Sequence, residues 1–582
     1  MQAMITLQGS KYLWKLPQVD KQHLLTIAAS YNLSIPVAQT LITRGYTSRE
    51  TIDPFLFSSF ERDVAHPRLL KDGHKAVERI IAAINNKEKI LVAGDYDVDG
   101  VTSSAMMMTC LLPLGANINF FLPNRVKDGY GLSTKVIDRA AASGYTVVIT
   151  VDNGITAFEP AVRAREKGID LIITDHHRPH DHLPEAYAIV NPNQSDCEYP
   201  YKVLAGVGVS FKLLSLLYEK LGRQMPAKAY ELLLLGTIAD VVPLTGENRF
   251  WVRHGLQYVN RVESPSFKML KHNGNLLDRP RISATDIGFS IAPQINALGR
   301  LEDARQGVKF LIGSDEAHIQ EVGKILLELN QARREIERSI FADVDGTIKQ
   351  GRIDLSQEKC IVAASSSWPP GVIGLVASRL VGAYGRPTIL LHTTKDGLAK
   401  GSCRSIPEFN MFNALNECRD LLKQFGGHAQ AAGLSLPVGN IPAFKQRIDE
   451  LITQQLKPID LVQKINVDAE ISLAEVTKKC IDDLEHLEPF GHENRQPLFF
   501  VKEAALVNKP QLLKDAHVKC SFFADGVIKP VMFFNRPELF PLLAAQENKS
   551  MALAVHLMEN HWNGRVNIEL QGIDLALPEQ KS

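Results

Sequence analysis

The chain has few cysteines, no net charge and no long apolar run, and each absence narrows what it can be. Its seven cysteines among 582 residues form no C-x-x-C pair and no dense framework. This argues against a disulfide-stabilised secreted domain and against a thiolate zinc site. Neither a signal-type segment nor an apolar run long enough to span a bilayer is present. The composition therefore predicts a cytoplasmic protein with no membrane segment.

Positive and negative charges balance, with 65 Lys and Arg residues against 65 Asp and Glu residues. A nucleic-acid-binding protein of this composition must concentrate its basic residues along a groove, because no overall positive charge attracts the phosphates. At 582 residues, 45% of them hydrophobic, the chain is long enough for several domains with cores of their own.

Three carboxylates at alternate positions follow a short apolar run. The run from Ile90 to Ala93 ends in Gly94, and Asp95, Asp97 and Asp99 come next. This pattern is typical of a buried strand whose C-terminal end opens into a site. Three carboxylates so close together repel one another unless a cation holds them. The stretch therefore predicts a metal site.

Three interpretations of this motif compete. An EF-hand loop also begins D-x-D-x-D-G, but Met106 occupies its twelfth position, where a bidentate Glu is required, so we reject it. A haloacid-dehalogenase-type phosphatase would use Asp97 as its nucleophile. A polar strand end would bind nothing at all. The motif alone leaves the last two interpretations open.

A strand, helix, strand unit carries further acidic and histidine residues. Two β-branched runs, 145–151 and 169–174, are expected to be strands, and the segment 158–168 between them has a helix-like composition. Asp152 follows the first run directly. Asp175, His176 and His177 follow the second.

One more acid, Asp240, follows the apolar stretch 231–239, which we interpret as a strand. The carboxyl ends of parallel strands share one edge of a sheet. We therefore expect five residues to converge in one crevice: Asp97, Asp99, Asp152, His176 and Asp240.

Asp and His ligands without cysteine favour Mn²⁺ or Mg²⁺ over structural zinc, and the histidine favours Mn²⁺. The acids and histidines suffice for two ions. Two ions about 3.5 to 4 Å apart would activate a water and stabilise both the attacking and the leaving oxygen of a phosphodiester. We therefore expect hydrolysis without a covalent enzyme intermediate.

The motifs GDYDVDG, VDNG, TDHH and ADVVPL, in this order, resemble the DHH phosphoesterase superfamily. Six more stretches are similar to its RecJ family of bacterial single-strand-specific exonucleases: PNRVKDGYGL (123–132), NPN (191–193), LAGVGVSFKL (204–213), INALGR (295–300), GSCRS (401–405) and FGGHAQAAGLSL (425–436). The resemblance extends from about residue 60 to the end of the chain and is weaker over the last hundred residues.

The resemblance implies an α/β fold with a parallel-sheet DHH domain, a second α/β domain joined to it by a long helix, and a C-terminal OB-like β-barrel. The expected parts are an N-terminal lead-in (1–60), a DHH catalytic domain (61–310), a connecting helix (311–349), a DHH-associated substrate-binding domain (350–458) and an OB-fold nucleic-acid-binding domain (462–578). The residues agree. Segment 316–345 contains no proline, and short alternating runs typical of a barrel follow residue 462.

The resemblance also assigns roles to the acidic and histidine residues. It implies that Asp152 bridges two ions and takes part in catalysis with His177, which contacts the scissile phosphate or the leaving oxygen. Asp95 is either a ligand or an acid just outside the ligand set. The implied metal ligands are Asp95, Asp97, Asp99, Asp152, His176 and Asp240.

Residues outside the acidic motifs are expected to bind the substrate. Ser402 and Arg404 are two residues apart, so on an extended segment they lie on the same side. We interpret Gly426-Gly427 as either a plain turn into a helix or a turn whose backbone N–H groups bind an anion. The resemblance implies a 5′-phosphate pocket and a contact of His428 with the substrate strand; the pocket residues are Arg125, Arg300, Ser402 and Arg404.

The resemblance implies a single-stranded-DNA-specific 5′ to 3′ exonuclease that releases 5′-mononucleotides with two Mn²⁺ or Mg²⁺ ions. It would act in DNA repair and recombination, with a RecQ-type helicase and a single-strand-binding protein as partners. A DHH-family phosphodiesterase of short oligonucleotides or cyclic dinucleotides is the alternative, which the chain length and the terminal barrel disfavour. A non-catalytic scaffold is a further alternative, which the intact acid and histidine set disfavours.

Overall fold

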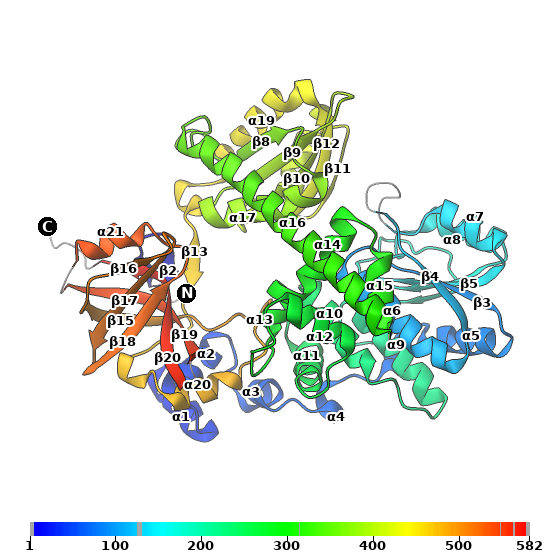
Figure 1. The fold of residues 1–582 in the computed structure, drawn as a ribbon, viewed down its shortest axis with the longest axis horizontal. Helices are drawn as coiled ribbons and strands as arrows, with labels where there is room; N and C mark the ends of the chain where they lie inside the picture. The colour runs from blue at the N-terminus through cyan, green and yellow to red at the C-terminus, as the bar shows by residue number, and fades with distance from the viewer. Residues whose placement is uncertain (1–4, 125–130, 314, 547–548, 563–564, 578–582) are drawn as a thin grey trace. The chain divides into compact units, whose positions relative to one another are not determined.

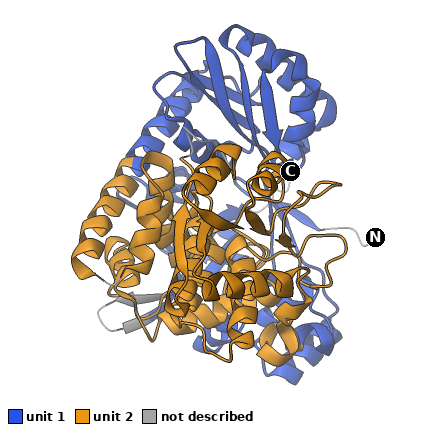
Figure 2. Ribbon diagram, turned by 90° about the vertical axis from the view of Figure 1, so that its right-hand side faces the viewer, with its two compact units in different colours: residues 1–52, 333–486, 496–582 blue, residues 53–332, 487–495 orange. Residues whose placement is uncertain are grey.

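The computed structural model of the protein describes residues 5–124, 131–313, 315–546, 549–562 and 565–577 (Figure 1). The chain divides into two compact units, which are coloured separately in Figure 2. Unit 1 comprises residues 1–52, 333–486 and 496–582, and unit 2 comprises residues 53–332 and 487–495. Each unit is thus assembled from segments that are far apart in the sequence.

Unit 2 is built on a fully parallel five-stranded sheet of order β4-β3-β5-β6-β7. Its strands are β3 (Lys89–Ala93), β4 (Asn117–Phe121), β5 (Tyr145–Val151), β6 (Asp170–Thr174) and β7 (Ala188–Val190). In β3, Ile90 and Val92 join one core cluster while Leu91 and Ala93 join another. Both faces of the sheet are therefore buried, which confirms the parallel α/β prediction.

Helices cover both faces of this sheet. Three of them pack with Ile90 and Val92: α5 (Gly73–Asn85), α6 (Val98–Leu111) and α9 (Gly206–Lys220). Two pack on the opposite face: α7 (Thr134–Ala142) and α8 (Phe158–Glu166), the second of which confirms the helix predicted between the two strands. The other helical elements of unit 2 include α4 (Phe60–Asp63), the short 3-10 helices η1 (Pro67–Leu69) and η2 (Leu112–Leu114), α10 (Lys228–Ala239), α11 (Gly246–Val259), α12 (Pro265–Asn273), α13 (Ala284–Asp286), the π-helix η3 (Ile287–Ile291), α14 (Ala292–Leu301) and α15 (Arg305–Ile312). Helix α3 (Arg49–Leu56) lies where unit 1 passes into unit 2.

The apolar stretch before Asp240 is a helix, so its interpretation as a strand was wrong. Helix α10 is buried along almost its whole length, including all residues from Glu231 to Thr237. A helix that is buried on every side has no alternation of polar and apolar residues, so periodicity cannot distinguish it from a buried strand. Asp240 follows this helix as its C-cap.

A single long helix, α16 (Glu316–Lys349), confirms the predicted connecting helix and leads into the second α/β sheet. This sheet lies in unit 1 and has the order β11-β12-β10-β9-β8. Its strands are β8 (Ile361–Ser365), β9 (Thr388–Thr393), β10 (Leu398–Arg404), β11 (Gln424–Gly427) and β12 (Ala431–Pro437), with helices α17 (Pro370–Tyr384), α18 (Met411–Glu417) and α19 (Ile441–Gln455).

The Gly426-Gly427 pair does not lead into a helix, so that prediction was wrong. Gly427 ends strand β11, which forms a hairpin with β12, and the backbone N–H of His428 donates to the carbonyl of Ala431. Gly427 has φ +134°, a backbone conformation that side chains other than glycine rarely adopt. The pair therefore enables a tight strand-to-strand turn.

The last part of the chain forms a closed barrel. Its strands are β15 (Phe499–Leu506), β17 (His517–Ala524), β18 (Val527–Phe533), β19 (Ser550–Trp562) and β20 (Arg565–Ala576). They pair in the order β15-β19-β20-β18-β17, and β15 also pairs with β17, so the ring closes. A five-stranded closed barrel is the architecture of an OB-fold and confirms the predicted barrel.

The N-terminal segment packs against this barrel within unit 1. Strand β2 (Leu13–Lys15) pairs with β1 (Thr6–Gln8) on one side and in parallel with β13 (Lys464–Asn466) on the other. Trp14 is fully buried beside Phe500. The predicted helical stretch near residue 20 is α1 (Lys21–Tyr31), capped by Asp20, and α2 (Ile35–Thr43) follows it. The smaller elements around the barrel are β14 (Ala469–Glu470), β16 (Gln511–Leu513), α20 (Lys478–Glu485) and α21 (Leu539–Ala544).

Within the described ranges, no single helix is long and apolar enough to cross a membrane. One helix pair, α1 with α2, meets the length and composition requirement jointly, and it is bent by 114°.

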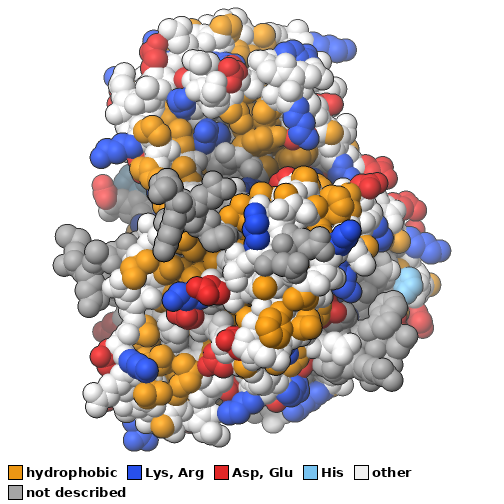
Figure 3. All heavy atoms as spheres, turned by 90° about the vertical axis from the view of Figure 1, so that its left-hand side faces the viewer, with side chains coloured by type: hydrophobic (Ala, Val, Ile, Leu, Met, Phe, Trp, Pro, Cys, Tyr) orange, Lys and Arg blue, Asp and Glu red, His pale blue; other side chains and the backbone are white. Residues whose placement is uncertain are grey.

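Charged side chains are dispersed on the face drawn in Figure 3. Among the described residues of this face, Lys and Arg are interspersed with Asp and Glu and form no continuous basic stripe. The basic groove expected for a nucleic-acid-binding protein without net charge therefore stays a prediction for other surfaces.

Candidate metal centre

The turn after β3 holds the first acids of the site. Asp97 is the N-cap of α6, and its Oδ1 accepts a hydrogen bond from the backbone N–H of Gly100 at 3.0 Å. Asp95 is only 2% exposed. A Cβ at Gly100 would lie 2.5 Å from the carbonyl oxygen of Asp95, so only glycine permits this close turn. The D-x-D-x-D-G pattern therefore forms a tight turn between β3 and α6, and its carboxylates lie on this turn.

The third acid of this motif, Asp99, binds the N-terminus of another helix. Its two carboxylate oxygens accept from the backbone N–H groups of Gly206 at 2.6 Å and Val207 at 2.7 Å, which begin α9. A helix N-terminus favours a carboxylate because its N–H groups are unpaired and its dipole is positive there. This contact was not predicted, although the glycine-rich start of α9 in LAGVGVSFKL signals a close backbone approach.

Asp152 sits in a strained turn directly after β5. Its φ is +60°, which is uncommon for a residue other than glycine, and its side chain is almost fully buried. A Cβ at Gly206 would lie 2.7 Å from the Cβ of Asp152, so the start of α9 packs against this turn only because it is glycine. Backbone strain of this kind is concentrated at functional sites.

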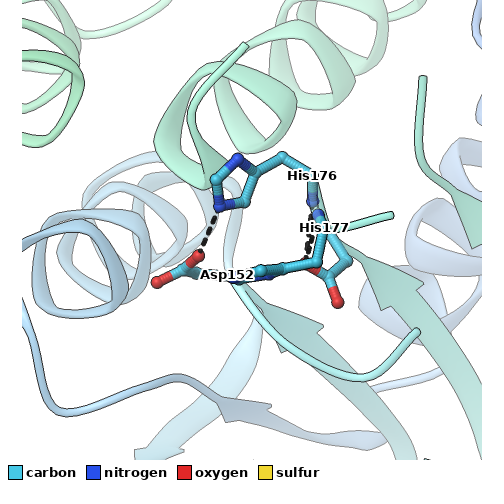
Figure 4. A group of neighbouring side chains, drawn as sticks. Asp152, His176 and His177 are labelled. Carbon is cyan, nitrogen blue, oxygen red and sulfur yellow. Dashed lines mark hydrogen bonds and ion pairs between the residues drawn. The ribbon is translucent and has the colours of Figure 1, made fainter. Parts of the chain in front are cut away.

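The two histidines after β6 have different environments. Nε2 of His176 lies 3.1 Å from Oδ1 of Asp152 (Figure 4). Its Nδ1 lies 3.7 Å from Oδ2 of Asp240. Nδ1 of His177 instead lies 2.7 Å from Oδ1 of Asp175, and its side chain is 46% exposed. Asp175 also accepts from the backbone N–H of both histidines and of Ile155. His176 therefore faces the acids, while His177 is held by Asp175 at the edge of the site.

The predicted residues do converge. In three overlapping groups, the ligand-type atoms lie within 4.8 Å of one another: Asp95, Asp97 and Asp152; Asp99, His176 and Asp240; and Asp152, Asp175, His176 and His177. Asp240 reaches the site from the end of α10, whereas the others follow strands of the sheet. Asp152 and His176 each occur in two groups, and of these two only Asp152 has two side-chain oxygens with which it could bridge a pair of ions.

Burial and mutual repulsion dominate the electrostatics of the site. Burial, followed by the charges of Asp99 and Asp97, raises the pKa of both Asp152 and Asp240 well above the usual carboxyl range. Burial and the charge of Asp97 raise the pKa of Asp99 to about 7, against the lowering effect of its two backbone hydrogen bonds. Several negative charges thus share a buried site that has too little positive charge to balance them.

The two histidines titrate in opposite directions. Burial, together with the neighbouring His177, lowers the pKa of His176 to about 4, so its ring is neutral near pH 7 and can donate a nitrogen lone pair to a metal. Burial also disfavours the charged ring of His177, but the hydrogen bond and charge of Asp175 outweigh it and raise the His177 pKa.

These residues fit a hard divalent cation. Carboxylate oxygens and neutral imidazole nitrogens are ligands for Mn²⁺ and Mg²⁺, and all seven cysteines are buried without a disulfide, at other places in the chain. The buried Oδ2 of Asp240 makes no hydrogen bond to any described residue. A cation would compensate the clustered charges that burial and repulsion make unfavourable.

A cavity of about 300 Å³ opens beside the acids, and the segment around α14 forms part of its wall. Arg300, predicted as a phosphate-binding residue, lines this cavity, and so do Tyr96 and Asn296, which were not predicted. Gly299 lies against the carbonyl oxygen of Tyr96, where a Cβ would be only 2.3 Å away. The complete lining is Asp95, Tyr96, Asp97, Val98, Asp99, Ala239, Asp240, Asn296, Gly299 and Arg300.

The remaining predicted substrate residues lie in unit 1 or outside the described residues. Arg404 and Ser402 are on the same side of β10, and a guanidinium nitrogen of Arg404 donates to Oγ of Ser402 at 3.2 Å. His428 lies in the turn of the β11–β12 hairpin. Arg125 falls outside the residues that the structure describes. Ser402 and Arg404 are thus brought together as predicted, and a pocket shared with Arg300 stays a prediction.

Two segments of the chain match known domain families. Residues 89–237 match the DHH family, N-terminal domain, and residues 357–454 match the DHHA1 domain. The parallel sheet, the acidic and histidine cluster and these two matches define a metal-dependent phosphoesterase of the DHH class. Residues 467–574, which contain the barrel, match the RecJ OB domain.

The chain belongs to the RecJ family. It is 35% identical over 574 residues to the single-stranded-DNA-specific exonuclease RecJ of Bacillus subtilis, covering 98% of this chain and 72% of that protein. The crystal structure of Thermus thermophilus RecJ in complex with Mn²⁺ matches with a TM-score of 0.81 and 29% identity, over 97% of this chain and 80% of that one. The Mg²⁺ complex of the same protein matches with a TM-score of 0.75 and 27% identity, over 97% and 78%.

Proposed function

We propose that this protein is a metal-dependent exonuclease that is specific for single-stranded DNA and removes 5′-mononucleotides in the 5′ to 3′ direction. The observation that carries the proposal is the convergence of five acids and a neutral histidine beside a cavity that Arg300 also lines. Single-strand specificity is the property named for the Bacillus subtilis relative. Here it would come from a narrow passage and from stacking rather than from reading the bases.

The acidic and histidine residues would hold two divalent ions. Asp152 would bridge them, and the other ligands would be Asp95, Asp97, Asp99, His176 and Asp240. Thermus thermophilus RecJ has been crystallised with Mn²⁺ and, separately, with Mg²⁺. We propose that this chain also binds either Mn²⁺ or Mg²⁺. When bound, such ions lower the pKa of a water molecule and stabilise the charge that develops on a phosphodiester.

His177 would act on the substrate rather than on the ions. Its ring is fixed by Asp175 at 2.7 Å, and that carboxylate raises its pKa, so the ring keeps a proton more readily than an ordinary histidine does. A protonated ring at the edge of the site can donate a hydrogen bond to the scissile phosphate or a proton to the leaving oxygen. Asp175 positions this ring without contacting the substrate.

The direction of hydrolysis would depend on a pocket for the 5′-phosphate. We propose that Arg125, Arg300, Ser402 and Arg404 bind this phosphate, because arginine forms bidentate hydrogen bonds with phosphate oxygens. His428, in the turn of the β11–β12 hairpin, would contact the substrate strand. An end held in this way presents its first linkage for hydrolysis.

Arg404→Ala should weaken the preference for a 5′-phosphate without abolishing hydrolysis. A charge-assisted hydrogen bond to phosphate contributes about 1.5 to 3 kcal/mol, so KM for 5′-phosphorylated strands should rise about 10- to 100-fold. KM for 5′-hydroxyl strands should change much less. Arg447→Ala is the matched control, because Arg447 is an arginine of α19 whose partner is Asp420. An unchanged phosphate preference in Arg404→Ala would place the pocket elsewhere.

We further propose that the barrel binds the strand beyond the site, and that the enzyme acts in DNA repair and recombination in the cytoplasm. A helicase of the RecQ type would supply single strands, and a single-strand-binding protein would share them. The barrel has the OB architecture, which commonly binds single strands through stacking and charge.

The direct test is the release of mononucleotides from end-labelled single-stranded DNA in the presence of Mn²⁺, with the same sequence as a duplex for control. We expect nucleotides to be lost from the 5′ end and the duplex to resist. Faster turnover on a dinucleotide than on a long strand would instead favour a phosphodiesterase of short oligonucleotides.

Mn²⁺ should also stabilise the folded protein. Ions that bind only the folded state add about 2.7 kcal/mol at a concentration of 100 Kd, which corresponds to a rise in Tm of about 5 °C or more for a unit of this size. The measurement is thermal unfolding with and without Mn²⁺, followed by a chelator. His176→Ala should reduce this shift, whereas His254→Ala, at a histidine of α11 outside the metal-ligand groups, should retain it.

A further inference from the structure

One stripe of the helical segment 284–300 is not buried. Outside this stripe and its immediate neighbours Gly288 and Ser290, every residue of the segment is buried. The stripe members are three or four residues apart, which places them on one face of a helix: Thr285, Phe289, Pro293, Asn296 and Arg300. Asn296 and Arg300 line the acidic cavity. The stripe therefore runs along the helix from the cavity, at Asn296 and Arg300, to Phe289.

The side chain of Phe289 is exposed to solvent, although the backbone around it is fixed by buried neighbours. Its side chain is 76% exposed, more than any other large apolar side chain that the structure describes. Ile287 and Ile291 on either side of it are fully buried, and a capping box between Ser283 and Asp286 fixes the start of the segment. Residues Ile287–Ile291 form a π-helix, a geometry that is rare and frequently lies at functional sites.

We propose that Phe289 stacks against a nucleobase of the DNA strand whose scissile linkage lies in the cavity. The inference rests on the proposed function and adds a base-binding residue to it. Every base offers a π-face, so an exposed phenyl ring on a rigid backbone binds single strands without selecting a sequence. Phe289 precedes Asn296 by seven residues, a rise of about 10 Å, or on the order of three stacked nucleotide steps of about 3.4 Å each. The stacked base therefore belongs to the first few nucleotides around the scissile linkage.

Steady-state kinetics of four variants test the stacking. Phe289→Ala should raise KM for a long single strand about 5- to 150-fold, with kcat nearly unchanged. KM for a dinucleotide should not change, because a dinucleotide does not reach the ring. Phe289→Trp should retain the KM of the wild type, and Phe289→Leu should resemble the alanine variant. Phe57→Ala, which removes a ring that is 56% exposed in the same unit, is the matched control and should behave as the wild type.

A strand with a single abasic position, moved stepwise from the 5′ end, locates the stacked base. In the wild type, one position should raise KM, and in Phe289→Ala the same position should have no further effect. An alanine variant with unchanged KM, or a leucine variant that restores KM as fully as tryptophan, would overturn the inference. If the wild type releases nucleotides while all variants match it, only the stacking fails. If the wild type hydrolyses no single strand, the proposed function fails with it.

Discussion

Asp152→Asn is expected to abolish hydrolysis of single-stranded DNA while leaving the protein folded. Asp152 belongs to two of the three groups of ligand-type atoms. If it bridges two ions as proposed, an amide in its place would remove its charge from both. We expect kcat to fall by about a thousandfold or more, since catalysis by paired ions depends on their joint position. The rise in Tm caused by Mn²⁺ should be lost as well.

The same substitution should stabilise the metal-free protein. Burial and the neighbouring acids raise the pKa of Asp152 well above its usual value. The unfolded chain therefore ionises at a lower pH than the folded protein, and folding free energy is lost as the pH rises above the usual carboxyl range. Asparagine carries no charge and avoids this loss. In the presence of a chelator, the Tm of Asp152→Asn should be at least equal to that of the wild type. The difference in Tm between the two proteins should be larger at pH 7 than at pH 4.

The control is Asp138→Asn, at a half-exposed acid of α7 whose partner is Arg163. Its activity and its Mn²⁺ response should match those of the wild type. A folded Asp152→Asn protein with near-normal hydrolysis would remove Asp152 from the ligand set. Lost activity with an unchanged Mn²⁺ shift would assign Asp152 to catalysis but not to metal binding.

The sequence predicted the strand-borne part of the site because local patterns determine it. Asp97, Asp152 and His176 follow apolar runs whose strands are short, buried and parallel, and the ends of such strands must share one edge. Asp240 was also predicted to join them, but at the end of a strand, whereas it follows helix α10. A fully buried helix lacks the periodicity that would distinguish it from a strand. The contact of Asp99 with the start of α9 was not predicted. The glycines there signal a close backbone approach, but they do not identify a partner that is more than a hundred residues away in the chain.

The contacts of the N-terminal segment were also not predictable from local sequence patterns. The sequence shows Trp14 in a mixed lead-in, but nothing local indicates that β2 pairs with β13 or that Trp14 packs in the core of the barrel unit. These contacts join residues about 450 to 560 positions apart. A truncation that removes the barrel alone would therefore leave Trp14 without its core, so a test of the barrel must remove residues 1–52 as well.

Asp574→Ala should strongly destabilise unit 1. Asp574 is fully buried on β20 and accepts hydrogen bonds from Nε1 of Trp14 at 2.9 Å and the backbone N–H of Tyr12 at 3.0 Å. Oγ of Ser10 also donates to it, and the Arg536 guanidinium lies 3.4 Å away. Alanine would leave these buried donors and one buried positive charge without their acceptor. Removing one partner from a buried charge pair costs about 3 to 5 kcal/mol.

The measurement is urea unfolding followed by Trp fluorescence, together with limited proteolysis of the N-terminal segment. We expect the unfolding free energy of unit 1 to fall by about 3 to 5 kcal/mol and the first fifty residues to become susceptible to protease. Asp482→Ala is the matched control, because Asp482 forms an exposed ion pair with Lys478 in the same unit, and such pairs contribute at most about 1 kcal/mol. If Asp574→Ala were no less stable than Asp482→Ala, the N-terminal hairpin would be held by apolar packing around Trp14 rather than by the buried carboxylate.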